Sequence, residues 1–118
     1  MNLGRVSSLA LFASGIGGIA RAEKMLKVLE LDATSSRGVT ETRVGLGGTY
    51  AALGAYGLLS RSPVAQRAVG VTWLGAGLTR LATRNVDRPR ADWTYWTFLA
   101  GELGLGVGTL VAVRPRRG

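Results

Sequence analysis

Glu102 is the residue of this chain whose presence is hardest to explain by packing alone. It is the only charged residue between Trp93 and Val113, in an otherwise apolar segment. A helix needs about 20 residues to cross a bilayer, and this segment is long enough. A carboxylate inside such a segment is costly and usually faces a protein interior or a polar cavity. We therefore expect Glu102 to lie inside a bundle of helices, beside a cation or hydrogen-bond donors.

Two arginines are the candidate partners of Glu102. Arg80 lies near the end of one apolar segment, and Arg43 immediately precedes another. If successive helices alternate in direction, both arginines lie on the side of the membrane where the segment of Glu102 begins. A long Arg side chain covers much of the remaining depth. The preferred pairing is Arg80 with Glu102, and Arg43 is the second choice.

Further polar side chains complete a buried polar cluster or candidate ligand site. Glu41 lies beside Arg43 in the sequence, and the tyrosine and tryptophan side chains would add hydrogen bonds. The predicted cluster consists of Glu102, Arg80, Arg43, Glu41, Tyr50 and Trp73. Three roles are open for it. The preferred one is a buried ion pair that fixes helix register; the others are a ligand pocket and a proton-coupled carboxylate.

Composition argues against most enzyme chemistry. The 118 residues include no cysteine and no histidine, so the usual ligands of zinc, haem and iron–sulfur centres are missing. No nucleophile constellation is evident, and Gly45-Leu46-Gly47-Gly48 lacks the pattern of a phosphate-binding loop. We expect a protein that is not an enzyme and has no cofactor and no metal.

The net charge of +8 comes from basic residues that lie in short clusters between apolar segments. Basic residues gathered at the ends of apolar segments are typical of contacts with lipid headgroups rather than with nucleic acid. Membrane lipids are therefore expected partners, and nucleic acid is not.

Four apolar segments predict an all-α fold, a four-transmembrane-helix bundle that forms one integral membrane domain over residues 1–118. The expected helices are about 4–22, 42–60, 63–84 and 92–113. Thr40 or Thr42 would cap the second, Ser62 with Pro63 would start the third, and Asp92 would cap the fourth. An amphipathic stretch at about 22–31 either extends the first helix or lies in the membrane interface.

Two alternatives to this topology stay open. Four apolar helices also build water-soluble bundles, but those show a charged face with a period of 3.6 residues, which these segments lack. Arg5, an apolar run and Ala20-Arg21-Ala22 also resemble a cleavable secretory signal. An uncleaved first helix is preferred because cleavage would leave three helices.

Small residues recur at every fourth position in three segments, where they would let helix backbones approach closely. The rows are Ser14, Gly18 and Ala22; Gly47, Ala51 and Ala55, with Gly48 beside them; and Ala100, Gly104 and Gly108. Packing within one chain is the preferred role, and a homodimer seam is the alternative. In the last helix, this row lies opposite Glu102, which shares its side with Leu99, Leu105, Gly106 and Thr109.

The motif Glu41-x-Arg43, followed by Gly47-Gly48, Arg80 and Glu102, resembles an uncharacterised family of small bacterial four-helix membrane proteins, the domain of unknown function number 4345. The resemblance covers roughly residues 5 to 113. It implies a four-helix membrane fold and carries no catalytic residues across.

The expected function is that of a non-catalytic protein of the bacterial plasma membrane. It would bind lipid or act as an accessory subunit of a membrane complex, with a protein partner or a second copy as possible partners. The alternative is a small proton-coupled transporter using Glu102. Compact four-helix exporters are similar in length, but their essential glutamate is in the first helix, where this chain has no acid.

Overall fold

The computed structural model of the chain describes residues 2–60 and 62–113, and all regular structure within them is helical. The expectation of an all-α fold is therefore confirmed. The helices are α1 (Leu3–Ala20), α2 (Ala22–Val28), α3 (Ser36–Thr42), the π-helical segment η1 (Arg43–Gly48), α4 (Thr49–Leu59), α5 (Pro63–Asp87) and α6 (Trp93–Ala112).

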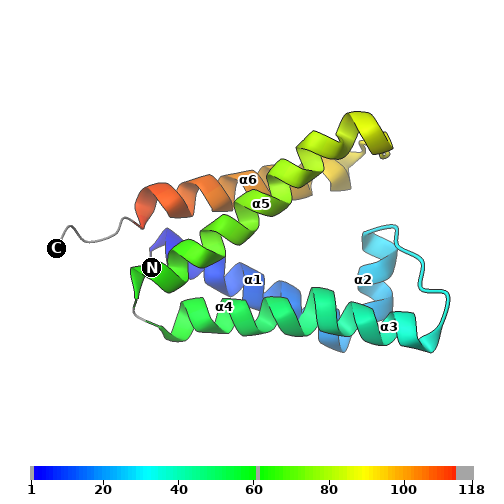
Figure 1. Cartoon of the computed structure of the whole chain (residues 1–118), viewed down its shortest axis with the longest axis horizontal. Coiled ribbons are helices and arrows are strands. Elements are labelled where there is room, and N and C mark those ends of the chain that lie inside the picture. Colours follow the sequence, from blue (N-terminus) through cyan, green and yellow to red (C-terminus); the bar gives the residue numbers. More distant parts are fainter. Residues whose placement is uncertain (1, 61, 114–118) are drawn as a thin grey trace.

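The helices form two packed pairs that diverge from one end of the molecule (Figure 1). In the first pair α1 lies along α4 and η1, and in the second α5 lies along α6. The pairs meet where α1 contacts both α5 and α6. At the other end they separate, and α2 lies in the space between them. The facing sides of the two pairs therefore lie on either side of α2.

Small residues explain the close packing of α1 against η1. A Cβ atom on Gly18 would lie 2.9 Å from the Cα of Gly47, and one on Gly47 would lie 2.8 Å from the nitrogen of Ile19. Side chains larger than hydrogen have no room at this contact. Among the described residues, a Cβ on Gly48 would in contrast meet only the carbonyl oxygen of Arg43, at 3.9 Å, so this position has room for a side chain.

The second of the four predicted helices starts earlier than the sequence predicts. Its helical backbone runs without a break from α3 through η1 into α4, and Ser35 caps it by accepting a hydrogen bond from the nitrogen of Gly38 (3.1 Å). The predicted start near residue 42 and the predicted caps Thr40 and Thr42 are therefore wrong. The Thr42 hydroxyl instead donates to the Gly38 carbonyl within the helix (3.0 Å).

The other helix boundaries follow local signals. Ser62 accepts from the nitrogen of Val64 (3.2 Å) with Pro63 in the first turn, and Asp92 accepts from the nitrogen of Tyr95 (3.1 Å), so both predicted caps are confirmed. Helix α1 ends at Ala20 because Arg21 leaves the helical conformation. The amphipathic stretch is a separate helix, α2, and the alternative in which it extends α1 is wrong.

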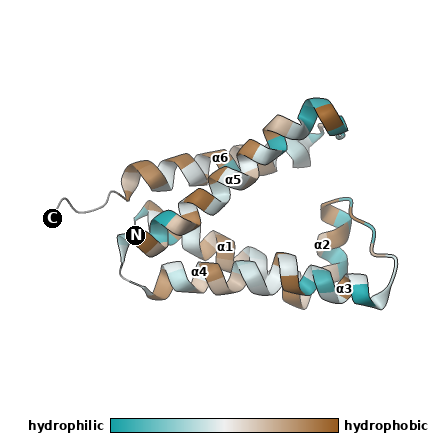
Figure 2. Cartoon of the chain, viewed as in Figure 1, coloured by the Kyte–Doolittle hydropathy of each residue, from teal (hydrophilic) through white to brown (hydrophobic). Residues whose placement is uncertain are grey.

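Within the described residues, one helix, α1, has both the length and the apolar composition of a membrane span, with a mean hydropathy of 1.4. Helix α5 carries Arg67, Arg80 and Arg84, and α4 alone has 11 residues. Figure 2 shows hydrophilic residues gathered around α2, α3 and the ends of α5, whereas the long stretches of α1, α4 and α6 are mostly neutral to hydrophobic.

Candidate functional site

Arg80 and Glu102 form a two-point ion pair between α5 and α6. The Arg80 Nε donates to Glu102 Oε1 at 2.5 Å, and Nη2 donates to Oε2 at 3.3 Å. The Glu102 side chain is 7% exposed and that of Arg80 is 29% exposed. The preferred pairing is thus confirmed. Such parallel hydrogen bonds fix the orientation of both groups as well as neutralising them.

The close packing of α5 against α6, at Glu102 and one turn further along α6, positions this pair. A Cβ atom on Gly77 would lie 3.2 Å from that of Glu102 and 2.7 Å from a methyl carbon of Leu103. One turn further along α6, a Cβ on Gly106 would lie 2.7 Å from the Cα of Leu74. The face of α6 that carries Glu102 is therefore also its packing face.

This arrangement corrects the expected packing row of α6. Ala100 and Gly104 are exposed, and, apart from the backbone of α6 itself, no described atom lies within 4 Å of a Cβ built on Gly104. Packing within the chain was therefore the wrong role for these two residues. Gly108 does make a contact, against the Leu3 side chain of α1. The homodimer seam remains a prediction.

Two aromatic rings lie close to the Arg80 guanidinium. Its central carbon lies 5.5 Å from the ring centre of Phe98 and 5.9 Å from that of Tyr95, within the range of cation–π attraction. The Tyr95 hydroxyl donates to the Arg80 carbonyl oxygen (3.3 Å). Tyr95 is buried, while its neighbour Trp93 is 85% exposed. Arg80 is therefore held at both its backbone and its side chain.

Arg43 and Glu41 do not join the cluster. Arg43 donates a short hydrogen bond through Nη1 to the carbonyl of Ile19 in the last turn of α1, and Glu41 is exposed. The carbonyls at a helix end lack partners within the helix and carry partial negative charge, which attracts a nearby arginine. The predicted place of these two residues beside Glu102 is wrong, because η1 presents Arg43 to α1.

Tyr50 and Trp73 lie near the ion pair but do not make the predicted hydrogen bonds to it. Both line a cavity that Arg80 and Glu102 also line, and they make no hydrogen bond to the pair. The Trp73 indole Nε1 instead donates to the Ser7 carbonyl of α1 (3.1 Å). Trp73 thus links α5 to α1, and Tyr50 forms part of a cavity wall.

A second buried polar contact, between α1 and α6, is not predicted by the sequence. The hydroxyls of Ser7 and Thr109 share a short hydrogen bond, and Ser7 also contacts the Leu105 carbonyl (3.3 Å). Both side chains are fully buried. One signal was available, because Thr109 shares the side of Glu102. Nothing in the sequence identified Ser7 as its partner.

Arg67 makes a further contact between α5 and α6 that the sequence does not predict. Its Nη1 donates to the carbonyls of Leu110 (2.9 Å) and Val113 (2.6 Å) at the end of α6. A basic side chain at this position satisfies carbonyls that the helix leaves without partners. Arg67 and Arg80 therefore tie α5 to α6 near opposite ends of their contact.

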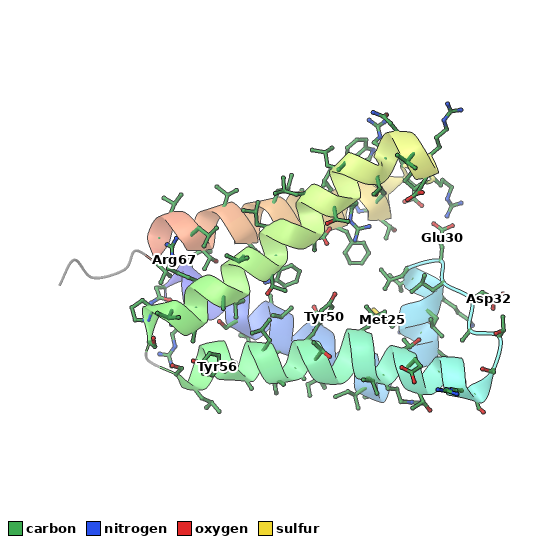
Figure 3. All side chains as sticks on the ribbon, in the orientation of Figure 1. Met25, Glu30, Asp32, Tyr50, Tyr56 and Arg67 are labelled. Atoms are coloured by element: carbon green, nitrogen blue, oxygen red, sulfur yellow. The ribbon has the colours of Figure 1, made fainter. Side chains whose placement is uncertain are left out.

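Two adjoining cavities open where the helix pairs diverge. A mostly apolar one of about 540 Å³ lies among α1, α2, α4, α5 and α6, and a more polar one of about 780 Å³ lies towards the ends of α5 and α2. Arg80, Glu102 and Tyr50 line both. In Figure 3, Tyr50 and Met25 lie on the side of the first pair that faces α5. The ion pair therefore borders both a mostly apolar and a more polar space.

Among the described residues, no group of three or more His, Cys, Asp or Glu side chains is placed to hold a metal ion. Comparison with protein-family models, with curated proteins and with solved structures finds no match to this chain.

Proposed function

We propose that this chain is a non-catalytic integral membrane protein of four helical spans, whose Arg80–Glu102 pair fixes the register of α5 against α6. The observation that carries this proposal is the distribution of polarity. The buried polar side chains include Ser7, Ser8, Gln66, Glu102 and Thr109. The exposed large apolar side chains include Leu9, Ile16, Leu59, Val71, Leu78, Val107 and Val111.

This distribution suits lipid better than water. Water-soluble proteins bury apolar side chains and rarely leave large continuous apolar surfaces exposed. In a bilayer, apolar side chains on the outside are solvated by lipid, and polar side chains are satisfied inside the bundle. The glycine contact of Gly18 with Gly47 supports the same environment, because close backbone packing replaces the missing hydrophobic drive between helices.

The proposed role is lipid binding, or service as an accessory subunit, in a bacterial plasma membrane. The two cavities beside the ion pair support a binding role, and the absence of histidine and cysteine supports a non-catalytic one. We further propose membership of the domain of unknown function number 4345, on the motif residues Glu41, Arg43, Arg80 and Glu102. The contact of Arg80 with Glu102 gives two of these residues a shared structural role.

Membrane extraction tests the integral character of the protein. We expect the chain to stay in the membrane fraction after washing with alkaline carbonate or high salt and to be released only by detergent. Single cysteines at Leu9, Val71 and Val107 should be shielded from a water-soluble maleimide and accessible to a lipid-soluble one. Release by carbonate, with full labelling at all three positions, would contradict the proposal.

A second candidate function is proton-coupled transport, which the lining of both cavities by Glu102 favours. The two-point bond to Arg80 gives the carboxylate a fixed partner and supports the structural role instead. Proteoliposomes separate the two. If Glu102→Gln folds normally and removes a pH-gradient-driven uptake, transport is correct. If the same variant fails to fold or insert, the register role is correct.

A further inference from the structure

The apolar cavity has the size and lining of a site for a chain-like ligand. Its volume of about 540 Å³ falls within the roughly 300–1,000 Å³ range of sites that enclose small molecules. Its walls come from both helix pairs and from α2. The apolar side chains that line it include Leu11, Met25, Val28, Leu29, Leu46, Trp73, Phe98 and Leu105.

The charged groups of this cavity are mostly basic. Arg21, Lys24 and Arg80 line it together with one acid, Glu102, so three positive charges face one negative charge, a net charge of +2. Arg21 and Lys24 are exposed, and neither is paired with a carboxylate among the described residues. An apolar cavity with two unpaired cations at one edge suits an acyl chain that carries an anionic headgroup.

Arg80 has further hydrogen-bonding capacity towards the cavity. Two of the five N–H donors of its guanidinium bond to Glu102, and the side chain is 29% exposed. The ion pair therefore neutralises Arg80 without using all of its donors. The ester carbonyls of a lipid are suitable acceptors for the remaining N–H groups.

The adjoining polar cavity has the opposite charge balance. Arg80 and Arg90 line it with four acids, Glu30, Asp87, Asp92 and Glu102, which leaves a net charge of −2. Arg90 is itself engaged with Glu30 (3.4 Å) and Asp92 (3.2 Å). In Figure 3, Glu30 extends from the end of α2 towards α5 and α6. The negative charge of this polar cavity would repel an anionic headgroup, whereas Arg21 and Lys24 at the apolar cavity would attract it.

We propose that the cavity between the two helix pairs binds one acyl chain of an anionic phospholipid, with the headgroup phosphate at Arg21 and Lys24. The chain lies against Met25, Trp73 and Phe98, and Arg80 donates to the ester region. This inference rests on the proposed membrane function and names its ligand.

The test uses the detergent-purified full-length protein, with phosphatidylglycerol as the anionic probe and phosphatidylcholine of the same acyl chains as the neutral one. Native mass spectrometry counts the lipids bound per protein. Wild type should retain one phosphatidylglycerol in preference to phosphatidylcholine. The double variant Arg21→Gln/Lys24→Gln should lose about thirty-fold in affinity for phosphatidylglycerol, since each basic residue near an anionic headgroup contributes about five-fold.

Two further variants control for charge and for the acyl chain. Lys27→Gln/Arg37→Gln removes two exposed cations that do not line the cavity and should leave binding unchanged. Gly17→Leu, at a position where a Cβ would lie 3.5 Å from Met25 Cε, should fill the cavity and reduce binding of both lipids. Circular dichroism should show that all variants are folded.

Several results would overturn the inference. Equal retention of the two lipids by wild type would exclude anionic selectivity, and equal losses in the two double variants would exclude a specific headgroup site. Preferential retention of free palmitate over phosphatidylglycerol would exclude the phospholipid as ligand. Release of the protein by carbonate would instead overturn the proposed membrane function, so the two failures are distinguishable.

Discussion

Arg80 and Glu102 lie on neighbouring helices and meet through two hydrogen bonds, the shorter of them 2.5 Å. Gly77 and Gly106 allow α5 and α6 to approach closely at Glu102 and one turn further along α6. Sliding one helix along the other by one turn would separate the charges and strand the buried carboxylate. The pair therefore favours one register out of the several that an apolar interface would tolerate.

Glu102→Gln should destabilise the protein by about 2–4 kcal/mol, because removing one charge of a buried pair leaves the other without compensation. Unfolding in mixed micelles of increasing sodium dodecyl sulfate content, followed by circular dichroism, measures the change. Glu23→Gln is the matched control, since Glu23 is exposed on α2. Equal stability of the two variants would show that the pair contributes nothing to the fold.

Replacing both partners should cost much less than removing one. The double variant Arg80→Met/Glu102→Leu removes both charges and keeps most of the apolar volume, and such replacements of buried ion pairs are often neutral or stabilising. A double-mutant cycle with the single variants should give a coupling energy above about 1 kcal/mol. Strictly additive effects would argue against a direct role for the contact.

Gly47→Ala should destabilise the contact of α1 with η1 by about 1–3 kcal/mol, because the added carbon would lie within 3 Å of the backbone of Ile19. Gly104→Ala is the control, since that position is open and alanine favours a helix over glycine by roughly 1 kcal/mol. Thermal or detergent denaturation of the two variants should shift in opposite directions. A loss of stability at Gly104 would instead support the homodimer seam.

Thr109→Val should destabilise the protein by about 1–3 kcal/mol, because the variant keeps the shape of the side chain but leaves the buried Ser7 hydroxyl without this partner. The double variant Ser7→Ala/Thr109→Val removes both hydroxyls and should recover part of the loss. Thr97→Val, at an exposed position on α6, should change stability little. A similar loss at position 97 would mean that the buried contact has no special role.

Local sequence signals predicted the features that depend on neighbours along the chain. Ser62-Pro63 and Asp92 start α5 and α6 because capping requires only side-chain and backbone groups within a few residues. Ser35 was missed, although it is a good capping residue, because the apolar pattern begins several residues later. The π-helical segment and the break at Arg21 have no comparable local signature in this sequence.

The sequence by itself determined that the chain is helical, that Glu102 needs an interior position, and that Arg80 is its preferred partner. Those conclusions follow from the length and polarity of segments and from the alternating direction of successive helices. Only the tertiary structure decided that Arg43 bonds to α1, that Ser7 meets Thr109, and that the face of Glu102 is the packing face of α6. Each of these depends on the rotation of a helix about its axis and on which neighbour covers it, and many rotations satisfy the same apolar pattern.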